Sequence, residues 1–435
     1  MNKFLFKHID NSSLIIFRMI FGLLCFLETA GAVVTGWIRR TLIEPDFTFS
    51  FIGFEWLQPL PGDWMYVYYI VMSIFGLLIM VGYKYRFSMF MFAVMWTSTY
   101  LMQKSSYNNH YYLLSLLSFI MVFLPAHRFA SIDVKLNPSL RRISMPNWCK
   151  WVFIIQLLIV YTYASAAKFY PDWLDTTVIE LLMRNKADIS VIGGILQHSF
   201  VHHVIAYGGI LFDGLIIPLL LFKPTRKYIF FISIFFHLFN SIVFQIGIFP
   251  YLSLSFSLFF FEPKTIHSLF LKRKPFYDKN EVSAPKHSSI ILACLSTYFI
   301  IQMALPLRHH FFKDDVLWTE EGHRLSWRMM LRAKGGRTSY TVIDTKTNNA
   351  IRINLDDYLT KKQQRGASNK PDVIWQFAQH LKKKFAQEGQ DVKVYVTSYV
   401  SVNGKPSKQL IDPEVDLANE RWHHFKHHDW ILPSK

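Results

Sequence analysis

The stretch WVFIIQLLIVYTYASAAKFYPDWL, residues 151–174, decides the class of this fold. Its first 17 residues form an apolar run long enough to cross a lipid bilayer. Lys168 follows directly, where the run meets the outside. A lysine deep in hydrocarbon costs about 3 kcal/mol, so such a residue usually has a function or a route for its ammonium group to the interface. From position alone, an interfacial anchor is the simpler interpretation.

The composition of the whole chain favours a membrane protein. Of its 435 residues, 51% are hydrophobic and 17% aromatic, which is too apolar for an ordinary soluble protein of several domains. The net charge of +17 could indicate a nucleic-acid partner. Much of the basic charge, however, lies in short segments between apolar runs, so anionic lipid headgroups are the expected partner. The three cysteines show no disulfide framework or CxxC site.

Nine apolar runs follow one another before residue 309. Most reach the roughly 20 residues that a spanning helix needs, whereas the fourth and the eighth are short. The N-terminus shows no signal-peptide cleavage pattern, so the first run is expected to remain as a spanning helix. The runs lie near residues 13–35, 64–83, 87–103, 110–125, 149–167, 198–222, 228–247, 249–262 and 288–308.

The segments between these runs differ in basic charge. The N-terminus and every second loop hold 18 Lys or Arg residues, and the intervening loops hold six. The positive-inside rule therefore predicts a cytoplasmic N-terminus, nine spans, and an outer location for residues 309–435. Lys168 belongs to a loop on the outer side.

From about residue 309 the composition is that of a folded polar domain. The stretch RTSYTVIDTKTNNAIRINL (residues 337–355) predicts a hairpin with its turn at TKTNNA. The stretch PDVIWQFAQHLKKKFAQEG (371–389) predicts an amphipathic helix, with proline in its first turn and glycine at its end. The stretch DVKVYVTSYVSVNGKPSKQLI (391–411) predicts two strands joined through Asn-Gly. The sequence thus predicts a mainly helical membrane domain, residues 1–308, and a mixed, β-rich domain, residues 309–435.

Polar residues inside the apolar runs are the candidates for chemistry. Asn109 and His110 open the fourth run on the outer side, and His237 and Asn240 lie three residues apart on one helical face. Taken singly, each is more often an interhelical hydrogen bond than a catalyst. Together with Lys168 they predict a polar pocket. Buried structural pairing is expected for three further charges: Arg18, Glu28 and Asp213.

Two other classes of site receive little support. The segment WHHFKHHDW (residues 422–430) has histidines at a helical metal-ligand spacing, but no third ligand is evident at a matching spacing. A solvated histidine-rich segment is the expectation there, and no metal site is predicted. The chain has no GxGxxG, GKS/T or GxSxG motif, so nucleotide binding and serine-hydrolase chemistry have no sequence support.

Seven segments together resemble one family. They are FRMIFG, LQPLPGDWMYVYYIV, SSYNNHYYLLSLLSF, AAKFYPDWL, HLFNSIVFQIGIFPY, WTEEGHRLSWRMM and VNGKPSKQLIDPEVDL. In this order they closely resemble the vitamin K-dependent gamma-glutamyl carboxylase family, from about residue 14 to 433. The resemblance implies a membrane enzyme that oxidises vitamin K hydroquinone with O2 to the epoxide. The base formed on the way removes a γ-proton from a protein glutamate, which then captures CO2, and no metal is implied.

The resemblance also implies roles for individual residues. Lys168 matches the base that takes a proton from the hydroquinone, and Asn109 and His110 match a pair beside the quinone oxygens. Arg184 matches an arginine that binds the carboxylate of the substrate glutamate. The other quinone-pocket matches are Tyr161, His237, Asn240, Met329 and Met330. The other matches around the substrate glutamate are His309, Trp318, Trp327 and Arg332.

The chain departs from the animal members of this family at several positions. Arg332 and Lys334 stand where animal enzymes have histidine and arginine, and His323 stands at an active-site tyrosine position. No Asn-x-Ser/Thr sequon follows residue 308, and the long C-terminal extension of animal members is not seen. We therefore expect a bacterial inner membrane location, with the endoplasmic reticulum as the eukaryotic counterpart. The expected partners are a glutamate-containing protein or peptide and the lipid bilayer, with no nucleic acid.

Three alternative functions remain open at this point. A quinol epoxidase that does not carboxylate protein would use the same pocket. A multi-pass transporter also places polar groups within membrane helices, although the sequence shows no inverted halves with broken helices. A catalytically silent membrane scaffold would leave the combination of Lys168, Asn109, His110 and His237 unexplained.

The charge asymmetry of the loops gives the first testable prediction. A reporter that is active only in the cytoplasm is expected to be active when fused to the N-terminus and silent when fused after residue 435. Cell fluorescence or enzyme activity of the two fusions measures this. An active C-terminal fusion would overturn the predicted topology.

Overall fold

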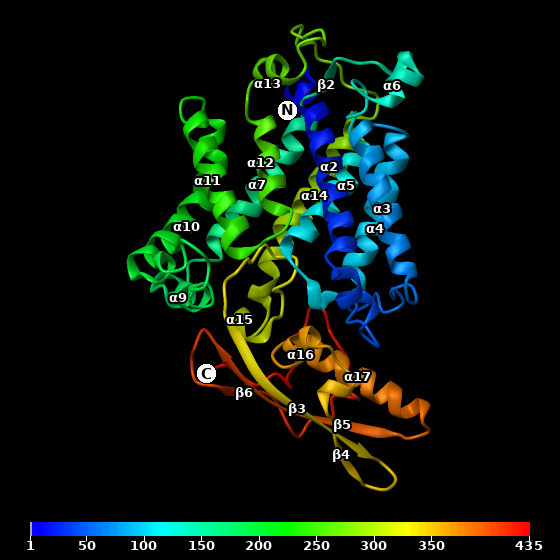
Figure 1. Ribbon diagram of the computed structural model, residues 1–435, viewed down its shortest axis with the longest axis vertical. Helices are drawn as coiled ribbons and strands as arrows, with labels where there is room; N and C mark the ends of the chain where they lie inside the picture. Colours follow the sequence, from blue (N-terminus) through cyan, green and yellow to red (C-terminus); the bar gives the residue numbers. More distant parts are fainter. Residues whose placement is uncertain (1) are drawn as a thin grey trace.

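The helical part of the molecule is a bundle joined to a smaller C-terminal domain (Figure 1). The computed structural model describes residues 2–435. Nine helices occupy the nine predicted apolar runs: α2 (Ser12–Val34), α3 (Trp64–Val81), α4 (Tyr85–Met102), α5 (Asn109–Phe123), α7 (Trp148–Ala166), α10 (Ser199–Leu221), α11 (Arg226–Phe244), α12 (Phe249–Ser255), which continues into a 3-10 turn at Phe256–Phe259, and α14 (Ser288–Leu307).

Six of these helices are long and apolar enough to cross a membrane: α2, α3, α7, α10, α11 and α14. Helices α5 and α12 are apolar but shorter, in agreement with the prediction that the fourth and eighth runs are short. Helix α4 has 18 residues, and its tyrosine, serine and threonine content lowers its hydropathy. The prediction of a polytopic helical bundle with a β-rich C-terminal region is confirmed.

Short elements close the two ends of the bundle. Strand β1 (His8–Asp10) pairs antiparallel with β2 (Ser144–Pro146). At the same end, the buried side chains of Asp10 and Lys274 form an ion pair. The short helices are α1 (Asn2–Leu5), α6 (Ile132–Leu136), α8 (Pro171–Leu174), α9 (Thr177–Arg184), α13 (Pro263–Phe270) and α15 (Val316–Thr319).

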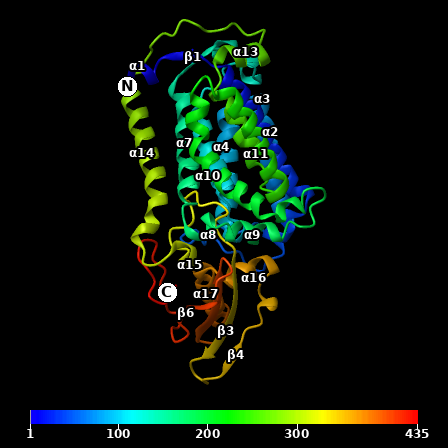
Figure 2. The same cartoon turned by 90° about the vertical axis from the view of Figure 1, so that its left-hand side faces the viewer.

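The N-terminus and the C-terminal domain lie at opposite ends of the bundle (Figures 1 and 2). Helices α6 and α13, which belong to the loops rich in Lys and Arg, lie at the N-terminal end. The loops poor in basic residues, including α8 and α9, lie at the end that carries the C-terminal domain. The structure therefore separates the two classes of loop as the positive-inside analysis requires.

Two glycines allow helices α2 and α3 to pack in close contact. A methyl group added at Gly22 would lie 2.3 Å from the backbone nitrogen of Met80. One added at Gly76 would lie 2.7 Å from the backbone nitrogen of Phe26. Close backbone approach through small residues is a common way for membrane helices to associate, because lipid provides no hydrophobic force between them.

The C-terminal domain contains a four-stranded antiparallel sheet with the order β4-β3-β5-β6. The predicted hairpin is confirmed as β3 (Lys334–Asp344) paired with β4 (Ala350–Arg352). The predicted strand pair is confirmed as β5 (Val392–Val402) with β6 (Lys408–Ile411), and the turn residues Asn403 and Gly404 both have positive φ. Asn403 and Gly404 are the central residues of a β-turn closed by the Lys405 N–H and the Val402 carbonyl, within a connection that spans residues 403–407, and such a turn favours Asn-Gly because both positions need left-handed backbone.

Two helices and a distant loop complete the core of this domain. Helix α17 (Pro371–Gln387) is the predicted amphipathic helix, and α16 (Lys361–Ala367) begins with a capping box between Thr360 and Gln363. Phe49, from the loop between α2 and α3, is fully buried in the same apolar cluster as the sheet and α17. The Gln376 side chain also donates to the carbonyl of Ser50, at 3.1 Å. The helical part therefore supplies part of the C-terminal domain's core.

This shared core predicts that residues 309–435 do not behave well alone. A 309–435 fragment lacks Phe49 and is expected to expose apolar surface, to bind a hydrophobic dye and to associate. In the full-length protein, Phe49→Ala is expected to lower the free energy of unfolding by about 3–5 kcal/mol. Size-exclusion chromatography of the fragment and thermal unfolding of the variant measure these effects. A monomeric fragment with a cooperative transition would contradict the prediction.

Candidate functional site

A cavity of about 650 Å³ lies between the helical part and the C-terminal domain. The start of α5 and the loop after α11 contribute to it from the helical part, and the segment 320–334 contributes from the C-terminal domain. Its lining residues are Trp37, Tyr107, Asn108, Asn109, His110, Tyr111, Gln245, Ile246, Gly247, Glu320, His323, Arg324, Arg328, Met329, Met330, Leu331, Arg332, Lys334, Asn369 and Lys370. Five of the residues predicted from the sequence are among them: Asn109, His110, Met329, Met330 and Arg332.

The cap of helix α5 positions Asn109 and His110. The Asn108 side chain accepts a hydrogen bond from the backbone N–H of Tyr111, which is a standard N-cap and fixes the first turn. The Asn109 amide donates to the carbonyl of Arg328, at 3.1 Å, and its oxygen accepts from the Tyr107 hydroxyl, at 2.8 Å. Asn109 therefore joins the helical part directly to the segment that forms the opposite wall.

That opposite wall has an unusual backbone. Four non-glycine residues within it have left-handed φ, between +52° and +63°: Glu320, Leu325, Trp327 and Met330. Conformations of this kind cost about 1–3 kcal/mol each and persist only where surrounding contacts impose them. Trp327 is almost fully buried and stacks on Tyr112 at 4.9 Å, so it supports the wall and does not line the cavity.

The charged residues of the wall form a network. Glu320 forms ion pairs with Arg332 and, at 3.2 Å, with Lys334. Burial alone would raise the pKa of Glu320, but the charges of these two residues hold it well below its usual range. Burial and the charge of Arg332 lower the pKa of His323, so this histidine is neutral near pH 7. The Nη1 atom of Arg332 lies 2.8 Å from the Nε2 atom of His323.

A second polar group lies deeper in the bundle. The Tyr161 hydroxyl and the His237 Nε2 atom are hydrogen-bonded at 3.2 Å, between α7 and α11. Phe249 separates His237 from His110, with ring centroids 6.0 Å from the first and 4.2 Å from the second. Asn240 donates to the carbonyl of Phe236 within its own helix, at 2.9 Å. The structure thus brings Tyr161, His237 and His110 together but leaves Asn240 occupied locally.

Lys168 forms a buried ion pair with Asp213 of helix α10. Its ammonium group also donates to the carbonyl of Ala164, at 2.9 Å, and lies 5.5 Å from the ring centroid of Trp173. The sequence predicts structural pairing for Asp213 without naming the partner, and the structure gives Lys168 as that partner. A buried cation is seldom left without an anion, because its desolvation costs several kcal/mol.

Lys168 lies behind the cavity and not in its wall. Leu331 lines the cavity and belongs to the same apolar cluster as Trp173, the ring next to the lysine. The Tyr170 hydroxyl donates to the Leu331 carbonyl. Tyr170, two residues after the lysine, therefore connects this segment to the cavity lining at Leu331.

Three other predicted residues lie outside the cavity lining. Arg184 is on the surface of α9, with its side chain 66% exposed and paired with Glu180 one helical turn away at 2.8 Å. His309 bonds the carbonyl of Pro306 through Nδ1, at 2.7 Å. The Trp318 indole donates to the carbonyl of Leu432, at 2.7 Å, within the core of the C-terminal domain.

The histidine-rich segment near the C-terminus is not simply solvated. His427 and His428 bond the two carboxylate oxygens of Glu321, at 2.7 and 2.9 Å, and His428 is buried. The expectation of a solvated segment is therefore wrong for these two residues, because their partner comes from more than 100 positions earlier in the chain. Among residues 2–435, no group of three or more His, Cys, Asp or Glu side chains could hold a metal ion.

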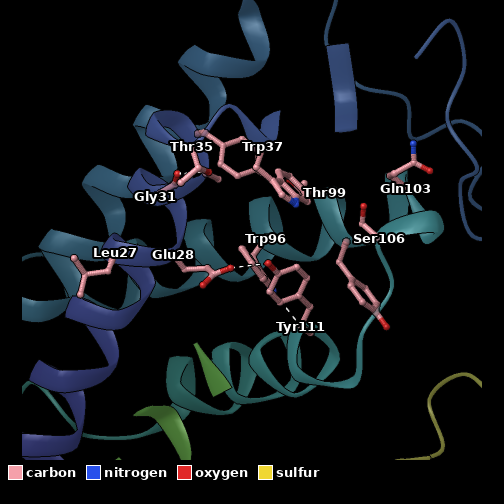
Figure 3. Close-up of a pocket in the computed structure, with 13 residues that line it drawn as sticks. Leu27, Glu28, Gly31, Thr35, Trp37, Trp96, Thr99, Gln103, Ser106 and Tyr111 are labelled. Carbon is pink, nitrogen blue, oxygen red and sulfur yellow. Dashed lines mark hydrogen bonds between the residues drawn. The ribbon is translucent and has the colours of Figure 1, made fainter. Parts of the chain in front are cut away.

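A smaller, mainly apolar cavity of about 250 Å³ adjoins the first (Figure 3). Helices α2, α3, α4 and α5 surround it, and it shares Trp37 and Tyr111 with the larger cavity. The Glu28 carboxylate accepts a hydrogen bond from the Tyr111 hydroxyl, at 2.6 Å, inside it. The sequence analysis expected structural pairing for Glu28, and the structure pairs it with a tyrosine.

A buried ion cluster ties the two parts together beside the cavity. Asp372, at the start of α17, pairs with Lys104 at 2.7 Å and with Arg324. Burial lowers the pKa of Lys104 to about 8 despite its partner. Burial acts to raise the pKa of Asp372, but the two cations outweigh it and hold that pKa well below its usual range. No sequence pattern indicates that Asp372 would meet Lys104, 268 positions away.

Two family models match the chain, and the segments that they match lie on either side of the larger cavity. The model described as HTTM domain matches residues 6–264, and the model described as Vitamin K-dependent gamma-carboxylase, lumenal domain, matches residues 287–435. The chain belongs to the vitamin K-dependent gamma-carboxylase family. No solved structure matches it.

Membership of the gamma-carboxylase family establishes several general properties. The protein is a multi-pass membrane protein with a lumenal C-terminal domain. The family acts on glutamate in protein substrates, and vitamin K hydroquinone, O2 and CO2 are its reactants. The second match begins at residue 287 and so includes α14 with the lumenal domain.

Two buried ring nitrogens fit the binding of a hydroquinone. Within residues 2–435, the Nδ1 atoms of His110 and His237 have no hydrogen-bond partner. A buried nitrogen left unpaired is costly, so such atoms usually have a partner that comes with a ligand or water. The two imidazoles lie on either side of Phe249, in the region where the sequence predicted the quinone pocket.

The Asp372 cluster gives a prediction about stability. Asp372→Asn leaves two buried cations without a counterion and is expected to lower the free energy of unfolding by about 3–5 kcal/mol. Because the folded-state pKa of Asp372 is depressed, its contribution is complete above its unfolded pKa of about 4 and is lost as pH falls below it. Thermal unfolding in detergent between pH 3 and 8, at roughly unit intervals, measures both effects.

The exposed Asp357 provides a matched control for this measurement. Asp357→Asn removes the same charge from the same domain without touching a buried cation. It is expected to change the unfolding free energy by less than about 0.5 kcal/mol. Equal destabilisation by the two variants, or an unchanged acid sensitivity in Asp372→Asn, would contradict the role given to the cluster.

Proposed function

We propose that this protein carboxylates the γ-carbon of glutamate in a protein substrate and couples that step to epoxidation of vitamin K hydroquinone. In this proposal Lys168 is the base that takes a proton from the hydroquinone. The observation that carries the proposal is the cavity at the junction of the two family-matched segments. One wall presents Asn109 and His110, and the other presents Met329, Met330 and Arg332. When bound, the hydroquinone supplies, through oxidation by O2, the base that removes the γ-proton; this proton leaves as water and the electron pair forms a C–C bond to CO2.

The Lys168–Asp213 pair supplies a route for one proton. A lysine can act as a base only as the neutral amine, which a guanidinium never becomes. The Asp213 carboxylate can take the ammonium proton within the existing hydrogen bond, so the pair as a unit holds or releases one proton without creating an isolated buried charge. Asp213 is thus assigned the role of holding the lysine in place and sharing its proton.

The remaining predicted residues take positioning roles in this proposal. Tyr161 fixes the orientation of His237 through their hydrogen bond, and Asn109 holds the segment around Arg328 against the bundle. Tyr161, His237 and Asn109 are buried, so their hydrogen bonds are worth more than they would be in solvent. Arg184 remains a proposed substrate contact, for a part of the protein substrate that lies along the surface of α9.

The topology and the division of the chain belong to the same proposal. The lumenal assignment of the C-terminal domain and its place opposite the N-terminus support a cytoplasmic N-terminus. The proposed boundary at residue 308 follows the end of α14 and divides the membrane helices from the C-terminal domain. We place the protein in a bacterial inner membrane because the C-terminal domain carries no glycosylation sequon.

The function is tested with purified protein, reduced vitamin K, O2 and a glutamate-containing peptide. Formation of the epoxide and incorporation of ¹⁴C-bicarbonate into the peptide are measured in the same sample. Both products are expected. Formation of epoxide without labelled peptide would favour the quinol epoxidase. The absence of both products would contradict an enzyme of this class.

Variants of Lys168 test its role as the base. Lys168→Ala alone leaves the buried Asp213 unpaired and destabilised, so Lys168→Ala combined with Asp213→Asn is the informative form. It is expected to fold and to lose at least about 100-fold of the epoxidation rate. Lys168→Arg keeps the ion pair and is expected to be equally inactive.

Lys186, on the same outer side, provides the control substitution. Lys186→Arg makes the same chemical change at a position with no ion pair within residues 2–435, and it is expected to retain epoxidation. Near-normal epoxidation by Lys168→Arg would show that Lys168 is an interfacial anchor.

A further inference from the structure

The large cavity has a marked excess of positive charge. Two carboxylates, Glu320 and Asp372, form ion pairs with four of the six cations in and beside it. Five of these cations line the cavity, and the sixth, Lys104, lies directly behind. They are Lys104, Arg324, Arg328, Arg332, Lys334 and Lys370.

Four of the six cations share the two carboxylates. Glu320 lies between Arg332 and Lys334, and Asp372 lies between Lys104 and Arg324. Neither carboxylate therefore has charge left for a further partner. Burial lowers the pKa of Lys334 to about 8 even with Glu320 beside it, and the charge of Arg332 acts in the same direction as burial.

The other two cations, Arg328 and Lys370, have no carboxylate of residues 2–435 within 4.0 Å. The Nε atom of Arg328 is buried without a hydrogen-bond partner, and one of its terminal nitrogens faces the His309 ring at 3.5 Å. Both side chains are half-buried in the cavity wall. An isolated charge in such a place loses several kcal/mol of hydration, and an anion from outside would restore it.

We propose that Arg328 and Lys370 bind the carboxylate groups of the side chain that is carboxylated, and that the product dicarboxylate binds more tightly than the substrate. This assignment rests on the proposed function for the identity of the ligand. Arg328 can bind a carboxylate through two parallel N–H donors, and Lys370 offers a movable ammonium group. After the reaction the γ-carbon carries two carboxylates, and in this proposal Arg328 binds one and Lys370 binds the other.

The same arrangement lowers the barrier to proton removal. Taking a proton from the carbon next to a carboxylate places a second negative charge on the same side chain. Fixed cations in a cavity that excludes water stabilise the doubly charged side chain more than the singly charged one, because their effect grows with the charge that develops. A side chain with a single negative charge is bound less tightly than the species that follow it.

The experiment compares the binding of three peptides that differ only in one side chain: glutamine, glutamate and γ-carboxyglutamate. Calorimetric titration into the detergent-solubilised full-length protein needs no turnover. The γ-carboxyglutamate peptide is expected to bind about tenfold or more tightly than the glutamate peptide, and the glutamine peptide more weakly still. Equal affinities of the two acidic peptides would overturn the proposal.

Charge-removing variants locate the binding. Arg328→Gln and Lys370→Gln are each expected to weaken γ-carboxyglutamate peptide binding about tenfold. Lys393→Gln, at an exposed position on β5, is the matched control and is expected to leave the affinity unchanged. If binding is unaffected in both cavity variants, the anion site is elsewhere. Equal affinity for inorganic phosphate would replace the carboxylate site with a general anion site.

The outcomes separate this inference from the proposed function. If the wild-type protein carboxylates the peptide while Arg328→Gln and Lys370→Gln leave peptide binding unaffected, the proposed site is rejected and the proposed function is retained. Charge-dependent binding of the γ-carboxyglutamate peptide without any carboxylation would reject the function and keep the site.

Discussion

The structure depends on one carboxylate, that of Asp372, buried between two cations from different parts of the chain. Lys104 comes from the loop between α4 and α5, and Arg324 comes from the segment that follows α14. A charge cannot be buried without compensation, so these three residues must assemble together. Their assembly fixes α17 against the end of the bundle, and the cavity is the space enclosed beside them.

Local patterns predicted the regular elements of this fold, and contacts between distant residues decided the rest. The nine apolar runs, the Asn403-Gly404 turn and helix α17 follow from periodicity and turn chemistry, which act within a few residues. The left-handed backbone at Trp327 and Met330 has no such local cause, because the surrounding contacts impose it. The insertion of Phe49 into a core that is built from residues after 308 is equally non-local.

The candidate site shows the same division. The resemblance selected Asn109, His110, Met329, Met330 and Arg332, and these residues meet in one cavity. Asp213 could have been matched with Lys168, since a buried lysine requires an anion, but the sequence offered several intramembrane charges to choose from. Arg328 and Lys370 drew no attention because an arginine or lysine in a polar segment normally faces water. Only the folded arrangement shows that their neighbours' carboxylates are already shared.

The burial of Phe49 in the C-terminal domain has a consequence for the order of assembly. A chain is synthesised from its N-terminus, so the loop carrying Phe49 emerges long before β3, α17 and β5, which enclose it. Until the last strands arrive, this aromatic side chain has no core to enter. The C-terminal domain therefore closes as the final step of biosynthesis, on a loop already positioned by the membrane helices. A chain that inserts α2 and α3 wrongly cannot complete its outer domain.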